Sequence, residues 1–267
     1  MSDPRIEPHM EESRAPLLDH LIELRMRLFR SVIAFAVTFV LCYIFAEHIY
    51  EFLVHPLAQA FGDDTNRRLI ATAPQETFIT YLRVAAFGGL CLAFPWVAGE
   101  LWAFVAPGLY KNEKRAFLPF MLATPVLFIA GASLVYYVIM PLAFRFFIGF
   151  ENPGGEGGLP IQLETRVSEY LSLVMTLMFA FGLCFQLPVL LTLLARVGII
   201  TADMLRKGRK YAIVGVFLVA AFLTPPDVIS QIGLALPVLL LYELSIFTVT
   251  LIEKRRAEDD ADSSAGP

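Results

Sequence analysis

The fold of this chain is decided around residues 101–115, LWAFVAPGLYKNEKR, where a long apolar run stops, breaks at Pro107 and Gly108, and turns basic. Segments long enough to cross a lipid bilayer lie on either side of this stretch. Proline followed by glycine ends a helix and favours a turn. We therefore interpret the stretch as a tight polar turn at a membrane surface, with Glu113 as its single acid among basic neighbours.

The composition is that of a membrane protein. The chain is 57% hydrophobic and 17% charged, whereas soluble domains carry about a quarter of charged residues. The charges collect at the termini and in short connectors, which leaves the uncharged runs 31–46, 116–144 and 170–195. Uncharged runs of this length indicate membrane-spanning helices, so we predict an all-α integral membrane protein.

Six transmembrane helices are expected, the last two of them short, at about residues 28–45, 77–104, 116–140, 168–194, 211–223 and 230–242. A surface helix containing Pro56 should follow the first span, and Pro141 should end the third, leaving the residues after it along the far surface. Gly88 and Gly89, inside the second span, indicate a close helix contact or a kink. Residues 1–16 are expected to be a disordered lead, 17–252 the membrane domain and 253–267 a charged tail.

The distribution of basic residues predicts the orientation. With six spans and a cytosolic N-terminus, the 21 lysines and arginines all lie on the cytosolic side except Arg67, Arg68, Arg83, Arg145 and Arg166. This is a strong positive-inside bias. With five spans the basic residues 254–256 would be exported, so six spans and two cytosolic termini are the better prediction.

Motifs for catalysis and nucleotide binding are absent from the sequence. It has no G-x-G-x-x-G, no Walker lysine loop, no H-E-x-x-H and no G-x-S-x-G. The three cysteines lie inside apolar runs without metal-ligand spacing. We expect no enzyme activity, catalytic residue, metal, cofactor or nucleic-acid partner.

Polar residues inside the apolar runs carry more information. Glu100, Gln186 and Glu243 should face protein or water, because a charge facing lipid is costly. Each could instead reach the interface, pair with a basic residue or bridge two helices. If the three lined one polar path, the chain would be a secondary transporter of a small solute, which is the alternative function.

Glu23 and Glu113 belong to the same predicted cytosolic surface, beside the starts of the first and third spans. Each alone is explained as a solvated acid balancing basic neighbours. Two carboxylates held at one surface could also bind guanidinium groups through paired hydrogen bonds, a geometry that lysine fits poorly.

Four motifs together resemble the TatC family, the core of the twin-arginine protein translocase: HLIELRMRL at 20–28, LWAFVAPGLYKNEKR at 101–115, AFGLCFQLPV at 180–189 and LTPPDVISQ at 223–231. The resemblance covers about residues 17–252. It implies six helices in a curved wall, both termini cytosolic, and a receptor that recognises folded precursors by the paired arginines of their signal peptides. It also implies export driven by the proton-motive force. With no transit peptide in the sequence, we expect a bacterial cytoplasmic (inner) membrane.

Site residues follow from the resemblance by position. It places signal-peptide binding at Glu23, Arg25, Phe104, Tyr110 and Glu113. It places docking of the single-span partners TatA and TatB at Thr224, Asp227 and Gln231, gives Pro56 a structural place in the first external loop, and implies several copies in one complex. The chain departs from the family twice, with Gln186 where many members have Glu and Glu100 where many have Gln.

Overall fold

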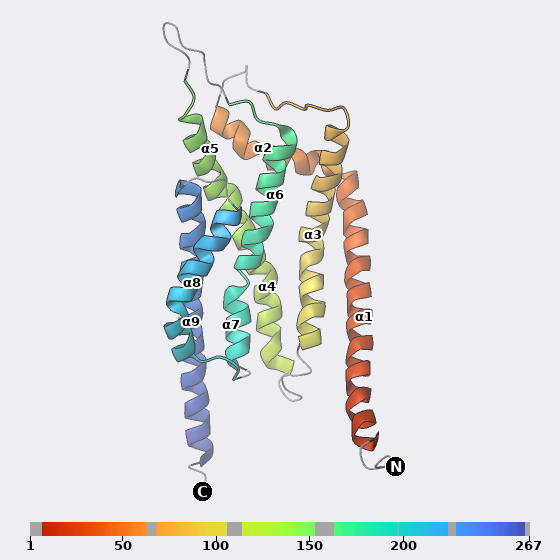
Figure 1. The fold of residues 1–267 in the computed structure, drawn as a ribbon, viewed down its shortest axis with the longest axis vertical. Coiled ribbons are helices and arrows are strands. Elements are labelled where there is room, and N and C mark those ends of the chain that lie inside the picture. Colours follow the sequence, from red (N-terminus) through yellow and green to blue (C-terminus); the bar gives the residue numbers. More distant parts are fainter. Residues whose placement is uncertain are drawn as a thin grey trace.

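A computed structural model describes residues 7–62, 68–105, 114–152, 163–196, 198–223 and 228–264. Within these ranges the chain is helical apart from short connectors, so the predicted all-α membrane fold is confirmed. The long helices stand side by side, with α2 crossing one end of the molecule (Figure 1). The start of α1 and the end of α9 both lie at the opposite end, on opposite sides of the molecule.

The elements follow one another in a simple order. They are α1 (Glu7–Ile44), α2 (Ala46–Phe61), α3 (Glu76–Val105), α4 (Lys114–Leu134), the π-helical turn η2 (Val135–Ile139), α5 (Met140–Ile148), α6 (Val167–Cys184), α7 (Leu187–Arg196), α8 (Ala202–Leu223) and α9 (Val228–Ser264).

Five helical stretches within the described ranges are long and apolar enough to cross a membrane: His20–Ile44, Glu76–Phe104, Phe120–Ile148, Val167–Arg196 and Gln231–Arg255. The remaining predicted span, 211–223, is the second half of α8, whose first half carries four basic residues. α8 packs antiparallel to α9 (Figure 1). Its apolar part is as short as the sequence predicts.

The third span does not end near Pro141, so that prediction is wrong. α4, η2 and α5 follow without a break to Ile148. In η2 the Met140 N–H donates to the Val135 carbonyl, five residues back. Such a π turn changes the hydrogen-bonding register just before the proline, which then sits in the first turn of α5, where its missing N–H is not needed. Residues 142–148 therefore extend the span.

Helical structure also reaches further than predicted at both ends of the chain. α1 begins at Glu7, so residues 7–16 are helical and not a disordered lead. α9 continues past Tyr242 to Ser264, and its apolar stretch alone has 25 residues, so the last span is not short. Glu243 does not interrupt the helix, because its Oε2 accepts a hydrogen bond from Arg209 Nη2 at 2.7 Å.

The predicted surface helix is α2, and Pro56 is built into it. Pro56 is buried together with Leu53 and Leu57 against the main core. Proline has no N–H, so the Phe52 carbonyl four residues back loses its helical donor. Tyr136 of η2 replaces that donor, its hydroxyl lying 2.7 Å from the Phe52 oxygen.

The main core surrounds α6, and α1 stands outside it. Tyr170, Val174 and Phe181 of α6 are almost fully buried and lie in one cluster with residues from α2, α3, η2, α5, α8 and α9. Only 6% of the residues in the most apolar stretch of α1 are buried. Apart from a few contacts with α2, α1 packs along α3, so the α1–α3 seam sets its position.

Candidate functional site

The α1–α3 seam is close enough in its middle for backbone contact. Thr38 Oγ1 donates to the Gly89 carbonyl at 2.8 Å. A Cβ added at Gly89 would lie 2.8 Å from the Phe39 Cα, closer than any real Cβ contact. The close contact predicted from Gly88 and Gly89 is therefore confirmed, and it explains why a residue without a side chain is needed at Gly89.

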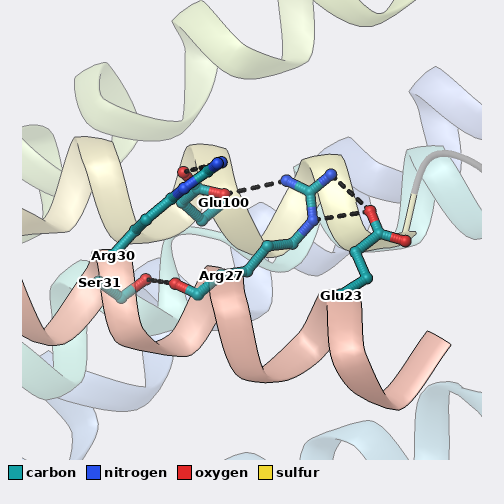
Figure 2. Close-up of polar contacts among 5 residues, drawn as sticks. All are labelled: Glu23, Arg27, Arg30, Ser31 and Glu100. Carbon is teal, nitrogen blue, oxygen red and sulfur yellow. Dashed lines mark hydrogen bonds and ion pairs between the residues drawn. The ribbon is translucent and has the colours of Figure 1, made fainter. Parts of the chain in front are cut away.

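At the end of this seam, Arg27 of α1 bridges two carboxylates. Its Nε and Nη2 donate to Oε1 of Glu23, one turn earlier, at 2.9 and 2.6 Å. Its Nη1 donates to Oε2 of Glu100 on α3 at 2.9 Å. Arg30 lies on the other side of Glu100, with 3.8 Å between Nη1 and Oε1 (Figure 2). The four side chains form an alternating chain of acid and base across the two helices.

Solvent exposure differs along this chain of charges. The Glu100 side chain is 13% exposed, Arg27 21% and Glu23 35%. Enclosing a carboxylate away from water costs free energy unless charged or hydrogen-bonding partners surround it, and Arg27 and Arg30 are such partners of Glu100. Glu23 is the open end of the cluster. Both of its bonds use Oε1, and its second oxygen points away from Arg27 (Figure 2).

A ring stack continues the seam toward the start of α1. His20 and Phe104 lie with their ring centroids 4.2 Å apart and their planes inclined by 20°. His20, Glu23 and Arg27 recur at helical spacing, so one face of α1 presents all three to α3. Phe104 is a predicted signal-binding residue and lies one turn of α3 beyond Glu100. The stack with His20 orients its ring.

The structure therefore brings three predicted residues together: Glu23, Phe104 and Glu100. Arg25 is exposed on α1 and is not part of the ion-pair cluster around Arg27. Glu113 and Tyr110 lie outside the described residues, so the expected pairing of Glu23 with Glu113 remains a prediction. Sequence reasoning missed the bridging role of Arg27, although the spacing of Glu23 and Arg27, four residues apart on a helix, is itself a signal for an ion pair.

The other predicted polar residues have local partners. Gln186 lies at the break between α6 and α7, where its amide donates to the carbonyls of Thr124 and Gly182 at 3.0 and 3.2 Å. Its Oε1 is buried without a hydrogen-bond partner among the described residues. Gln231 donates to the Phe217 carbonyl of α8 at 3.3 Å. Thr224 and Asp227 lie outside the described residues.

A shared polar path is not formed. Glu100 pairs at the α1–α3 seam, Gln186 bridges α6 to α4, and Glu243 pairs with Arg209 between α9 and α8. α1 and α9 stand at opposite sides of the molecule (Figure 1). The geometry of these three residues gives no support to a solute transporter.

Comparison with known proteins agrees with the helical membrane fold. The sequence model of the family described as "Sec-independent protein translocase protein (TatC)" matches residues 19–237, most of the chain. The chain belongs to the TatC family. Members of this family are components of a protein translocase, so this chain is a subunit for protein export and not an enzyme.

Relatives and a solved structure match over nearly the whole length. TatC of Magnetococcus marinus is 47% identical over 254 residues, covering 95% of this chain and 91% of the relative. TatC of Escherichia coli K12 is 40% identical over 236 residues, 88% of each chain. A crystal structure described as the twin-arginine translocase receptor TatC superposes with a TM-score of 0.75 at 36% identity, covering 87% of this chain and 98% of that one. The TatC fold is thus shared throughout.

Proposed function

We propose that this TatC-family chain is the receptor subunit of a twin-arginine translocase, and that Glu23 binds an arginine of the signal peptide. The hydrogen bonding and partial exposure of Glu23 support this proposal. It is a half-buried carboxylate at the end of the α1–α3 seam, it binds a guanidinium group through one oxygen, and the other oxygen points away from Arg27 (Figure 2). A carboxylate in this arrangement can accept hydrogen bonds from a further guanidinium group.

Arginine is favoured over lysine at such a site for a geometric reason. A guanidinium group presents two parallel N–H donors to a carboxylate, whereas an ammonium group acts as a single point charge. A second carboxylate at Glu113, on the turn that follows α3, would supply the partner for the second arginine. Phe104, Arg25 and Tyr110 would border the bound signal.

The membrane setting follows from the charge pattern. We propose that the end of the molecule holding Glu23 and the start of α8 faces the bacterial cytosol, with both termini on that side of the inner membrane. The basic residues of α8, Arg206 to Lys210, lie toward this end (Figure 1), as the positive-inside rule requires.

Partner docking is proposed for the opposite end of the α8–α9 pair. Thr224 and Asp227 come between these helices in the sequence and Gln231 lies in the first turn of α9, and we propose that single-span TatA and TatB subunits pack here in a complex of several copies. Gln231 ties this turn of α9 to α8 by donating to the Phe217 carbonyl. Its replacement by Ala should reduce co-purification of the partners while signal binding is kept, and unchanged partner recovery would count against this assignment.

The test of the receptor site is export of a folded reporter carrying an Arg-Arg signal. We expect Glu23→Gln to lower export by about tenfold or more, because a charge-assisted pair to a carboxylate is replaced by a neutral amide. Glu51→Gln, an exposed acid on α2 at the other end of the molecule, is the matched control and should leave export unchanged. Undiminished export by the Glu23→Gln, Glu113→Gln double variant would exclude the site.

A further inference from the structure

Arg27 already occupies the carboxylate that is proposed to receive the signal arginine. Three of its five N–H donors are used, two toward Glu23 Oε1 and one toward Glu100 Oε2. An incoming guanidinium would therefore meet a carboxylate that is neutralised by a group of its own chemical kind. A signal arginine that binds both oxygens of Glu23 needs Oε1 as well as Oε2, so its paired contact is an exchange with Arg27 and not a simple addition.

We infer that Arg27 is a resident guanidinium that sets the threshold of signal binding, an inference that rests on the proposed role of Glu23. When a signal arginine binds Glu23, Arg27 gives up its two bonds to Oε1 and is retained by Glu100. Glu100 can hold it because this acid is the most enclosed of the four and already bonds Arg27 Nη1 at 2.9 Å.

The net charge of the cluster differs before and after the signal arginine binds. Glu23, Glu100, Arg27 and Arg30 are neutral as a group, so no acid is left unpaired in the empty receptor. After exchange the signal arginine neutralises Glu23, while Arg27 and Arg30 together face Glu100 and leave a local excess of positive charge. That excess weakens retention of the signal and favours its later release.

Displacement of Arg27 adds the same free-energy cost for every cation that binds Glu23 at its expense. Arg27 contacts Glu23 Oε1 through two N–H groups at once. A signal arginine can restore both contacts, whereas a lysine ammonium acts as a single point charge. The resident arginine therefore raises the threshold for both kinds of signal, and arginine remains the better competitor.

The chain offers a matched pair of variants with opposite predicted effects. Arg27→Gln empties Glu23 and should lower the precursor concentration for half-maximal crosslinking of an Arg-Arg signal by about fivefold, equivalent to about 1 kcal/mol. It should lower the half-maximal concentration of a Lys-Lys signal by a similar factor, because the cost of displacing Arg27 is common to both signals. Glu100→Gln removes the second anchor of Arg27, leaves it on Glu23 alone, and should raise the half-maximal concentration by about threefold.

Arg30→Gln is the charge control, because it removes the same charge from the same cluster at a residue that contacts Glu100 but not Glu23. We expect it to change the half-maximal concentration by less than about twofold. All variants are measured as full-length protein in membranes with the native partner subunits, using site-specific photocrosslinking. Membrane level and proteolysis pattern are recorded for each variant.

The outcomes separate this inference from the receptor proposal. Equal effects of Arg27→Gln and Arg30→Gln, or weaker binding by Arg27→Gln, would overturn the exchange. If the Arg27→Gln protein fails to accumulate in the membrane, the Glu100→Gln variant tests the exchange by itself. Signal binding by Glu100→Gln that is unchanged or tighter than wild type would then refute the exchange. If Glu23→Gln crosslinks to the signal as well as wild type does, Glu23 is not a signal-binding residue. That result would refute the receptor proposal independently of the Arg27 variants.

Discussion

At the scale of single residues, Pro56 and Tyr136 show how one missing hydrogen bond is compensated across the fold. The proline removes the helical donor of the Phe52 carbonyl, and the Tyr136 hydroxyl takes its place from another helix. The ring of Tyr136 also stacks on Phe52 with centroids 4.3 Å apart. The surface helix α2 is thus tied to the third span at the point where proline weakens it.

A double-mutant cycle tests this compensation. Tyr136→Phe should lower the unfolding free energy by about 1–2 kcal/mol, because the enclosed Phe52 carbonyl loses its donor. In a Pro56→Ala background the restored N–H can serve that carbonyl, so the same substitution should cost clearly less. Thermal unfolding of the purified protein in detergent gives the four values. Additive effects would show that Tyr136 does not replace the proline donor.

The two partners of Arg27 differ in how far they could be predicted from the sequence. The sequence shows two acids in or near apolar segments but not which base each one meets. Glu23 and Arg27 are neighbours on any helix, so that pair was accessible from spacing alone. Glu100 is 73 residues away from Arg27 in the chain, and only the packing of α3 on α1 joins them.

At the scale of elements, the α1–α3 seam positions the candidate site. α1 has little other protein contact, so its register against α3 depends on the close approach at Gly89 and on the polar and ring contacts toward residue 20. A side chain at Gly89 would push α1 away from α3. The ion pairs of Arg27 with Glu100 would then lengthen.

Substitution of two glycines on α3 tests this dependence. Gly89→Ala should reduce disulfide formation between cysteines placed at positions 20 and 104 and should lower export, since overpacking costs about 1–3 kcal/mol. Gly99→Ala is the control, because nothing lies within 4 Å of the added Cβ. The native cysteines are first replaced. Equal crosslinking in the two variants would mean that Gly89 does not set the seam.

The π turn in the third span allows a helix to continue through a proline. A proline in an apolar run was expected to end the helix, but the register change at η2 lets the helix continue through Pro141. Proline rules are local, whereas the alternative hydrogen bonding is stabilised by packing, since Val135, Tyr136 and Ile139 are all buried.

At the scale of the whole molecule, the helices run between two chemically different ends. The start of α1, the start of α8 and the end of α9 share one end, and α2 lies across the other (Figure 1). The polar contacts of α8 with α9 are concentrated near the first end, where Arg206 bonds Thr250, Arg209 bonds Glu243 and the Glu253 carboxylate accepts from the Ala202 N–H. Each of these bonds gives a charged side chain near this end a partner on the neighbouring helix.

Accessibility labelling tests the orientation of these ends. In a cysteine-free background, a cysteine at Glu51 on α2 should react with an impermeant maleimide in intact cells. A cysteine at Lys207 in the first half of α8 should react only after permeabilisation, because the positive-inside rule keeps that basic segment in the cytosol. Labelling of position 207 from outside would reverse the proposed topology.

The sequence by itself determined the class of the molecule, the approximate positions of its spans and its family, because hydrophobic length and motif order are properties of the chain alone. It also pointed to Glu23 and Phe104. The predicted ends of the first and last helices and of the third span were wrong, because the helices continue through charged residues and, at Pro141, through a π turn that changes the hydrogen-bonding register. Tertiary structure alone decided that Arg27 joins Glu23 to Glu100, since an ion pair between separate helices exists only once their faces are brought into register at the Gly89 contact.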